Sequence, residues 1–518
     1  MSIQNEINRI NNDLDTQTDL IASIKFALQS KGYIVTAVMA AGEVWYKATN
    51  TNKADITTIN IEKSYTPSTY DECWDASASG DGSVMAYVEG NKLTIAGDGS
   101  SRIKLSPNMR KAFSDFTSVT SINNIDLLDT SDVTNMSAMF QCSIGLTELD
   151  LSKWDVSNVT SMAGMFAGHS SVGEMSLTSI GDVSKWDTSR VESMGGMFQK
   201  CTSLQTLNVA DWNTSSVTDM RNMFYECIAL TELDVATKKV NEGTENEYTA
   251  WDVSNVSKFN SMFSMGSYNS GSASRPLAEL DVSNWDTSSA TDMSFMFYAC
   301  RPQTRMVDLS NWDVSKVTTF DHMFAHSFLT IGDTSNWRVT TACTNLNALF
   351  LSVQNTSLNV SGFDTSNVTV FEQMFQGCIQ ATEIIGLENF DTSNSLGFSE
   401  MFQNCWKLKK LDLSSFDTTK AKDGAPASTN GTVTNTLNRM FDGMRVLEEI
   451  TLGANFSFDG DGTSPDSAGI LPTPDSSYIS GADGNWYTAD GTAYTPAEIQ
   501  AMDNPAGTYY AVKSVTNG

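Results

Sequence analysis

The sequence is short of positive charge. Its 518 residues contain 32 Lys and Arg against 61 Asp and Glu, which gives a net charge of −29 at pH 7. A surface that binds nucleic acid or anionic lipid presents a basic face, so this balance argues against both kinds of partner. No apolar run approaches the ~20 residues of a membrane-spanning helix, so we expect no membrane insertion.

Residues that build metal sites, disulfides and catalytic centres are also scarce. Histidine occurs three times, and the eight cysteines form no Cys-x-x-Cys pair or other metal-binding spacing. The sequence contains no nucleophile elbow, Walker A loop or Gly-rich dinucleotide fingerprint. These absences predict a non-enzymatic protein without a cofactor. A glycan-cleaving enzyme that acts through scattered Asp pairs is the remote alternative.

The sequence is rich in one repeat. The segment SKWDVSNVTSMAGMF at residues 152–166 recurs in variants such as SNWDTSSATDMSFMF and SNWDVSKVTTFDHMF, with a base period of 25 to 27 residues. A period in the twenties is typical of a solenoid, in which each unit forms one coil. Eleven units align on the aromatic of Trp-Asp and the Phe of Met-Phe: Leu128/Phe140, Trp154/Phe166, Trp186/Phe198, Trp212/Phe224, Trp251/Phe263, Trp285/Phe297, Trp312/Phe324, Trp337/Phe350, Phe363/Phe375, Phe390/Phe402 and Phe416/Phe441.

Each unit divides into two predicted halves. Before the aromatic, an L-x-x-L-x-L run such as Leu146, Leu149 and Leu151 predicts a strand with one buried face. After it, Asp and Ser predict a turn, and a Thr such as Thr160 predicts a helix N-cap. Met and then Met-Phe follow at the spacing of one helical face. The repeat therefore predicts an α/β solenoid, similar to a leucine-rich repeat, with about 11 coils and with Trp and Met-Phe stacked in its core.

Cysteine follows the same period. Five cysteines lie three residues after a repeat Phe, which places them at equivalent positions of successive coils. We expect them to be buried, reduced thiols rather than metal ligands or disulfides. These residues are Cys201, Cys227, Cys300, Cys378 and Cys405.

The repeat resembles a known family. Units such as LDLSKWDVSNVTSMAGMFAG and LNVADWNTSSVTDMRNMFYECIALTELDV are similar to the BspA-like leucine-rich repeats of bacterial surface proteins, in their W-D-x-S-x-V-T-x-M-x-x-M-F form. The resemblance covers residues 120–455 and implies adhesion to proteins or cell surfaces. It departs from the pattern at NWRVTTACTNLNALF, where Arg338 replaces Asp and Leu349 replaces Met.

The amino-terminal residues carry a separate pattern. Eight positions spaced alternately four and three residues apart predict a coiled-coil helix, and their isoleucine content favours a homotrimer. The alternative is an amphipathic helix, or two helices broken at NND, packed on its own domain. The segments MSIQNEINRI and LIASIKFALQSKG also resemble the start of bacteriophage tail-fibre and head-fibre proteins. The predicted oligomerisation residues are Ile3, Ile7, Ile10, Leu14, Gln17, Ile21, Ile24 and Leu28.

Five segments follow from these patterns. They are the helix at 1–32, a small β-rich region at 33–78, an N-terminal cap at 79–119, the repeat array at 120–457 and a C-terminal unit at 458–518. Residues 33–40, 43–49 and 54–62 are expected strands, EGNK a hairpin turn, and Thr495–Glu498 a capping box. The segment DGDGTSPD is similar to a calcium loop but has Ile470 where a bidentate Glu is needed, so we expect a turn, with weak calcium binding as the alternative.

Two sets of residues are candidates for binding. The first is a ladder of acidic residues four positions before the repeat aromatic, on the exposed strand face: Asp150, Asp182, Asp281, Asp308, Asp333 and Asp412. Such a ladder either solvates the face or binds sugar hydroxyls, cations or calcium. The second set lies in two insertions between coils, which are either tolerated variation or recognition loops: Glu242, Glu245, Glu247, Tyr248, Tyr268 and Arg275.

These observations favour a bacteriophage virion fibre. Its N-terminus would bind a capsid or tail protein, and its repeats would bind a host or mucosal glycan or protein. A bacterial cell-surface adhesin is the alternative. The opening residues lack the basic flank and apolar segment of a secretory signal, which favours assembly in the host cytoplasm and residence in the virion.

Overall fold

The computed structural model describes residues 37–99, 102–266, 277–422, 437–458 and 469–513. These residues pack into two compact units. The first contains the described residues up to Val217 together with Glu226–Leu230, and the second contains Thr218–Tyr225 and the described residues from Thr231 onward.

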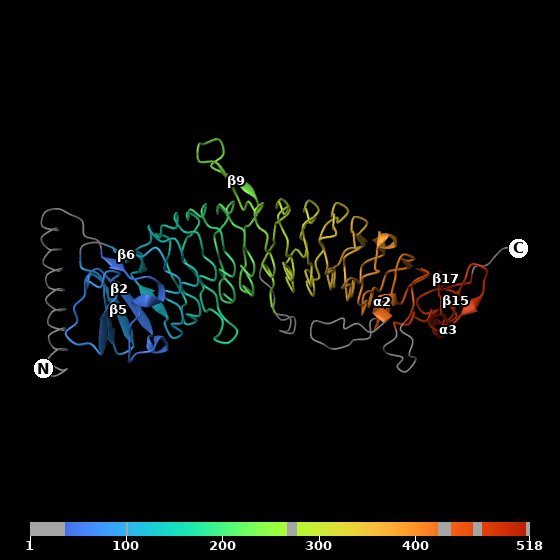
Figure 1. The fold of residues 1–518 in the computed structure, drawn as a ribbon, viewed down its shortest axis with the longest axis horizontal. Helices are drawn as coiled ribbons and strands as arrows, with labels where there is room; N and C mark the ends of the chain where they lie inside the picture. Colours follow the sequence, from blue (N-terminus) through green and yellow to red (C-terminus); the bar gives the residue numbers. More distant parts are fainter. Residues whose placement is uncertain (1–36, 100–101, 267–276, 423–436, 459–468, 514–518) are drawn as a thin grey trace, which may run out of the picture. The chain divides into compact units, whose positions relative to one another are not determined.

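The first unit begins with a five-stranded sheet in the order β3-β4-β5-β2-β7 (Figure 1). The predicted hairpin is confirmed, because β4 and β5 pair antiparallel from Met85↔Ala96 to Glu89↔Lys92. β2 pairs in parallel with β7, which belongs to the first coils and so joins the sheet to the repeats. The strands are β1 (Val38–Met39), β2 (Thr58–Glu62), β3 (Glu72–Asp75), β4 (Met85–Glu89), β5 (Lys92–Ala96), β6 (Ile103–Leu105), β7 (Ser121–Asn123) and β8 (Leu128–Asp129).

One expected strand of this region is instead a 3-10 turn. The turn η1 (Gly42–Trp45) overlaps the start of residues 43–49, while η2 (Lys53–Asp55) and η3 (Ile125–Leu127) are similar short turns. The Trp45 indole is fully buried and donates a 2.7 Å hydrogen bond to the carbonyl of Ala112. Packing of this one aromatic side chain therefore outweighs the strand propensity of its neighbours.

The predicted helical turn of each repeat is wrong, and with it the α/β fold class. The described residues contain only two α-helices, of four and five residues, and neither lies in the Met-Phe segment. In all eleven units the residue two before the repeat Phe has a positive φ between 51° and 64°, which a right-handed helix excludes. These residues are Ala138, Gly164, Gly196, Asn222, Ser261, Phe295, His322, Ala348, Gln373, Glu400 and Arg439.

The backbone of this segment bonds between coils instead of along a helix. In the first unit, the N–H groups of Met136, Ala138 and Phe140 donate to the carbonyls of Ser161, Ala163 and Met165 on the next coil, at 2.8 to 2.9 Å. Alternate residues therefore form a parallel ladder, and Met and Phe still point into the core. Each repeat therefore consists of turns, short parallel strands and isolated bridges.

The predicted helix N-cap at the repeat Thr is also wrong. This Thr belongs to the backbone hydrogen bonds between coils. The N–H of Thr160 donates to the carbonyl of Thr134 at 2.8 Å, and its Oγ1 donates to the same oxygen at 3.2 Å. In the second unit, Thr318 makes the same two bonds to the carbonyl of Thr291. The threonines therefore connect successive coils.

The predicted aromatic core is confirmed. The rings of Phe140 and Phe166 stack at 5.6 Å with an interplanar angle of 2°, and those of Trp285 and Trp312 at 6.2 Å and 3°. The repeat Phe side chains are at most 1% exposed. An additional ring, Phe113, stacks on Phe140 at 5.6 Å, so the stacking begins one coil earlier than the aligned repeat.

The buried cysteines are confirmed as well. All eight cysteines are free, and all except Cys73 are buried. The Sγ atoms of Cys201 and Cys227 donate to the carbonyls of Phe166 and Phe198 on the preceding coils, at 3.3 and 3.0 Å. Burial raises the pKa of these thiols well above the ordinary value.

The second unit ends in a five-stranded sheet in the order β13-β14-β17-β15-β16, which covers the last coil (Figure 1). The predicted capping box is confirmed, since the N–H of Thr495 donates to the Glu498 carboxylate at 2.7 Å. The elements are β9 (Lys238–Val240), β10 (Tyr248–Ala250), β11 (Ser357–Asn359), β12 (Glu383–Ile385), η4 (Leu387–Asn389), β13 (Lys410–Leu413), α2 (Thr419–Lys422), β14 (Glu449–Leu452), β15 (Trp486–Tyr487), β16 (Ala493–Tyr494), α3 (Pro496–Gln500) and β17 (Gly507–Tyr510). Within the described ranges, no helix has both the length and the apolar character needed to cross a membrane.

Candidate functional site

The acidic ladder takes part in local turns. In each of the six predicted ladder positions, a carboxylate oxygen accepts a hydrogen bond from the backbone N–H two residues later, at 2.9 to 3.1 Å. This Asx geometry satisfies the backbone at the end of the strand segment. The six residues are Asp150 and Asp182 in the first unit, and Asp281, Asp308, Asp333 and Asp412 in the second.

Hydrogen bonds from serine stabilise the charged form of these carboxylates. The Oγ and N–H of Ser152 lower the pKa of Asp150, and Ser184 and Ser335 do the same for Asp182 and Asp333. The charged form of these three carboxylates is therefore favoured, and in all six ladder positions an acceptor oxygen is engaged in its own turn.

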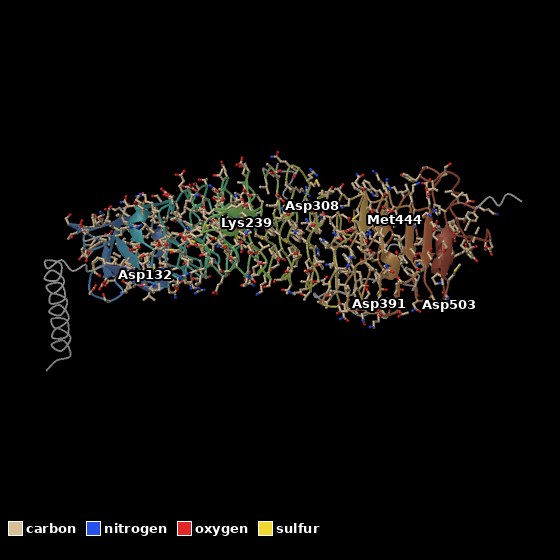
Figure 2. The ribbon with its side chains drawn as sticks, turned by 90° about the horizontal axis from the view of Figure 1, so that it is seen from above. Asp132, Lys239, Asp308, Asp391, Met444 and Asp503 are labelled. Atoms are coloured by element: carbon tan, nitrogen blue, oxygen red, sulfur yellow. The ribbon has the colours of Figure 1, made fainter. Side chains whose placement is uncertain are left out.

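A second set of aspartates, those of the Trp-Asp pairs, makes the same kind of turn. Asp155 accepts from the N–H and Oγ of Ser157 at 3.0 and 2.7 Å, and Asp391 accepts from the N–H of Ser393 at 3.0 Å. Asp308 and Asp391, one from each set, are labelled in Figure 2. The predicted role of the repeat Asp in shaping the turn is thus confirmed.

Part of the ladder lines a groove in the first unit. The groove has a volume of about 590 Å³ and opens on the strand face of successive coils, next to β7. Its polar lining contains two amides, three carboxylates and one ammonium group: Asn123, Asn124, Asp126, Glu148, Asp150 and Lys153. The ladder residue Asp150 is therefore brought together with five polar side chains that the acidic ladder did not include.

The groove carries an excess of negative charge. Lys153 Nζ lies 2.9 Å from Asp126 Oδ2, and this hydrogen bond lowers the pKa of Asp126. Asn123 Nδ2 donates to Asn60 Oδ1 at 2.7 Å. Glu148 forms a backbone bridge with Ser179, while its exposed side chain makes no hydrogen bond or ion pair within the described ranges. The lining can therefore accept hydrogen bonds from hydroxyl or ammonium groups of a ligand.

The first candidate insertion forms the β9–β10 hairpin, which projects from the coils of the second unit (Figure 1). Lys239, labelled in Figure 2, lies 3.2 Å from Glu247, and the N–H of Gly243 donates to Glu247 at 3.0 Å. Glu242 and Glu245 are exposed, and Tyr248 begins β10. Glu247 thus stabilises the hairpin, while Glu242 and Glu245 remain open to solvent.

Several predicted residues lie outside the described ranges. These are the loop residues Tyr268 and Arg275, the calcium-like segment that begins at Asp459, and all eight residues of the predicted oligomerisation seam in residues 1–28. Among the residues that the structure does describe, no three His, Cys, Asp or Glu side chains gather closely enough to hold a metal ion.

Sequence reasoning missed an aromatic cluster in the second unit. Trp406 is 45% exposed and Tyr478 is 51% exposed. The Arg445 guanidinium lies over both rings, 5.8 Å from the Trp406 centroid and 5.6 Å from that of Tyr478. Trp406 lies outside the Trp-Asp repeat, four residues after Phe402. A Trp at a position that the repeat does not explain is the feature of the sequence that could have marked it as a candidate for binding.

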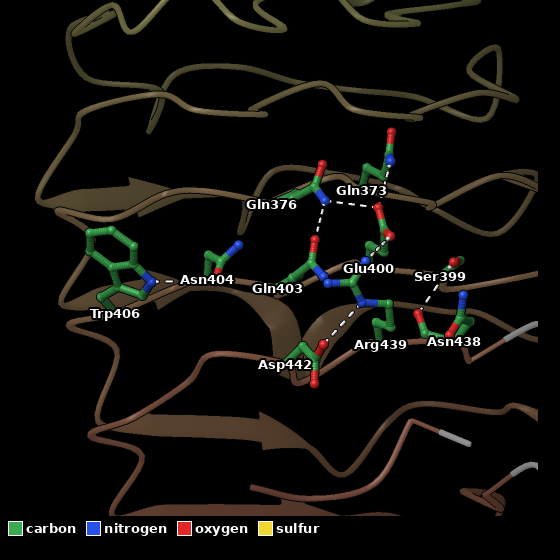
Figure 3. A network of polar contacts seen from close by, with 10 residues as sticks. All are labelled: Gln373, Gln376, Ser399, Glu400, Gln403, Asn404, Trp406, Asn438, Arg439 and Asp442. Carbon is green, nitrogen blue, oxygen red and sulfur yellow. Dashed lines mark hydrogen bonds and ion pairs between the residues drawn. The ribbon is translucent and has the colours of Figure 1, made fainter. Parts of the chain in front are cut away.

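A polar network lies on the same coils as Trp406 (Figure 3). Glu400 accepts hydrogen bonds from the side-chain amides of Gln373 and Gln376 at 2.7 and 2.8 Å, and Arg439 lies 3.5 Å from its other oxygen. Burial, together with the nearby charge of Glu400, raises the pKa of Glu372, whose Oε1 is buried without a hydrogen-bond partner in the described chain. The network therefore connects three successive coils through side chains.

Comparison with known proteins identifies the repeat. No curated protein and no solved structure matches the chain. A family model described as "Mycoplasma protein of unknown function, DUF285" matches residues 107–232, 174–264, 231–356 and 344–442, which together span well over half of the sequence. The overlapping matches follow the repeat, and the first begins near the additional coil at Phe113. The chain therefore belongs to the DUF285 family.

Proposed function

We propose that this chain is a non-enzymatic binding protein, a component of a bacteriophage virion fibre, whose coils attach to a host-cell or mucosal surface. The observation that carries the proposal is the polar groove of the first unit. The backbone groups of the coils are engaged in hydrogen bonds between coils, whereas the groove presents carboxylate oxygens on an open face, among them those of the exposed Glu148. Exposed donors and acceptors gathered in one concavity are typical of a binding site.

Two sequence resemblances support a role in surface adhesion and a location in the virion. The repeat is similar to the BspA-like repeats of bacterial surface proteins, which implies adhesion. The segments MSIQNEINRI and LIASIKFALQSKG are similar to the start of phage fibre proteins, which implies a place in the virion. A bacterial cell-surface adhesin is the second candidate, favoured by the repeat resemblance alone. Mass spectrometry of purified virions from the source culture distinguishes the two, because an adhesin is absent from the particles.

Groove binding is tested with a charge-neutralised double variant of the full chain, Glu148→Gln with Asp150→Asn. The Asn side chain preserves the Asx turn, as Asn213 does naturally by accepting from the N–H of Ser215 at 3.1 Å. We expect adsorption to host cells or immobilised mucin to fall about tenfold, the effect of losing one hydrogen bond to a charged group.

The matched control is Asp281→Asn with Asp333→Asn, which changes the net charge equally at ladder positions of the second unit. It should adsorb like the unmodified chain. Equal loss in both double variants would assign adsorption to overall charge, and undiminished adsorption of the groove variant would place binding elsewhere.

A further inference from the structure

We propose that Trp406, Arg445 and Tyr478 form a binding site for an anionic saccharide. The site lies in the second unit, uses none of the residues of the groove and has the opposite charge at its centre. The proposal therefore goes beyond the proposed function. Binding at this site and binding in the groove are tested by different variants.

The geometry places one cation over two aromatic rings. Trp406 and Arg445 lie at the same position of consecutive coils, four residues after Phe402 and Phe441, and Tyr478 comes from the C-terminal segment. Arg445 Cζ is 5.8 Å from one ring centroid and 5.6 Å from the other, within the range of cation–π attraction. Attraction to two rings favours this position of the guanidinium, so less side-chain freedom is lost when a ligand binds.

The exposure of these rings is exceptional in this chain. The sequence contains eleven Trp, and the ten others are 8% exposed or less, whereas Trp406 is 45% exposed. The Trp406 indole Nε1 points toward Asn404 Oδ1 at 3.4 Å (Figure 3). A large apolar face open to solvent contributes nothing to the core and is available for stacking with a ligand.

The Arg445 side chain keeps its hydrogen-bonding capacity. Within the described ranges its guanidinium makes no hydrogen bond or ion pair, so its N–H donors face solvent. Arg301 provides the contrast: it lies 4.5 Å over the ring of Phe328, but its Nε donates to the carbonyl of His326 at 2.9 Å. A stacked guanidinium with free donors matches the two oxygens of a carboxylate or sulfate.

An anionic saccharide fits both parts of the site. The C–H face of a pyranose ring stacks on an exposed indole, while its acidic group reaches the guanidinium. Lys407, the next residue in the chain after Trp406, is exposed and brings a second positive charge to this coil, with Nζ donating to Gln380 Oε1 at 2.6 Å. Because the whole chain carries a net charge of −29, an extended polyanion is repelled, which favours recognition of single acidic units by a local cationic site.

The test uses the full-length chain and two acidic probes, 3′-sialyllactose for a carboxylate and a sulfated lactose for a sulfate, with lactose as the neutral comparison. We expect at least one acidic probe to bind about tenfold or more tightly than lactose, with affinity falling as salt rises. Bound ligand should also protect the exposed Trp406 from iodide quenching. Comparing the two acidic probes identifies the acidic group.

Variants localise the binding. Arg445→Met should weaken it about tenfold or more, and Arg445→Lys should restore it only in part, because Lys lacks the planar fork. Trp406→Ala should weaken binding and remove the quenchable fluorescence. The control Arg301→Met changes the net charge by the same amount at an arginine already hydrogen-bonded to the backbone, and it should leave the affinity unchanged.

Three results would overturn the proposal. The first is equal weakening by Arg445→Met and Arg301→Met, which would mean that only overall charge matters. The second is the absence of binding by either acidic probe at millimolar concentration. The third is binding of lactose as tight as that of the acidic probes. An acidic peptide that bound Arg445 while both saccharides failed would identify a protein-binding site instead.

Discussion

The indole Nε1 of Trp312 donates a 3.0 Å hydrogen bond to the backbone carbonyl of Val282, on the preceding coil of the second unit. The same carbonyl accepts the N–H of Trp285 at 3.2 Å, so one oxygen both closes its own turn and receives the next tryptophan. The indole hydrogen bond to a carbonyl of a preceding coil recurs, with distances of 2.9 to 3.4 Å, at Trp154, Trp186, Trp212, Trp285 and Trp337. Trp at this position therefore contributes a polar connection between coils as well as a stacked ring.

Replacing Trp312 by Phe should lower the free energy of unfolding by about 1–2 kcal/mol. The change removes the indole donor and some buried area, while the Val282 carbonyl keeps its bond from the Trp285 N–H. Urea unfolding followed by circular dichroism measures the loss.

The same substitution at Trp406 is the matched control, because that ring is 45% exposed and lies outside the aromatic core. Its effect should stay within about 0.5 kcal/mol. If Trp312→Phe were equally harmless, the hydrogen bond between coils would contribute nothing measurable.

Thiol accessibility gives a second prediction. Seven cysteines are buried and only Cys73 is partly exposed, so a thiol reagent at neutral pH should modify one group per native chain quickly. Cys73→Ser should abolish that fast reaction, and denaturant should release the remaining thiols. Rapid modification of several thiols in the Cys73→Ser variant would contradict the burial of the cysteine positions.

Stability at alkaline pH gives a third prediction. Burial raises the pKa of Cys405 from 9.0 to about 12, and that of Cys343 likewise to about 12. A thiol with a raised folded pKa stabilises the fold fully below pH 9. That contribution is lost as pH rises toward 12, because the unfolded chain releases its protons first. The unfolding free energy should therefore fall between pH 9 and 12.

A variant isolates one thiol in this titration. Cys405→Ala is less stable than the unmodified chain at pH 8 because it leaves a cavity, but it lacks the titrating group. The stability difference between the two proteins should narrow above pH 9, by at most about 1.4 kcal/mol per pH unit. A difference that stayed constant up to pH 11 would mean that Cys405 does not titrate in this way.

The sequence predicts those parts of the fold that depend on side-chain chemistry. The Asx turns at Asp155 and Asp391, the buried cysteines and the capping box at Thr495 each follow from a residue type with a strong local preference. The aromatic core follows from the repeat period alone, since equivalent residues of successive coils must stack. The acidic ladder also falls where it was expected, but most of its bonding serves local turns.

The backbone conformation of the Met-Phe segment could not be predicted in this way. The left-handed position carries nine different residue types in eleven units, and Gly occupies it only at Gly164 and Gly196. Side chains there give no consistent signal, because hydrogen bonds to the next coil impose the conformation. Met-x-x-Met-Phe spacing fits a helix equally well, so only the bonds between coils distinguish the two structures.

The candidate sites were only partly predictable for a similar reason. The groove brings Asn123, Asp126 and Glu148 beside the ladder because their coils stack, and no periodic pattern marks those three residues. The cluster at Trp406 joins Arg445 of the next coil to Tyr478 of the C-terminal segment, a pairing that depends on how the terminal sheet covers the last coil. Such contacts join segments that share no common repeat, so they depend on tertiary packing and cannot be predicted from the repeat period.

A pair of adjacent glycines tests the left-handed position directly. Gly196 has φ +64° and lies two residues before Phe198, whereas its neighbour Gly195 has no positive φ. Gly196→Ala should lower the free energy of unfolding by about 1 kcal/mol, the cost of holding an L-residue in the left-handed region. The new Cβ would meet the flexible end of Gln199 at 3.1 Å and its Cβ at an ordinary 3.8 Å, so steric crowding adds little.

The matched change Gly195→Ala carries the same added methyl group without the conformational cost. The equivalent positions of the preceding units hold Ser137 and Ala163, so a side chain fits there. This variant should be neutral or slightly stabilised, because Ala restricts the unfolded chain more than Gly does. Urea unfolding of the two variants side by side should therefore separate them by about 1 kcal/mol or more. Equal stability would mean that Gly196 does not occupy the left-handed conformation, and the replacement of the expected helical turn by a ladder between coils would have to be reconsidered.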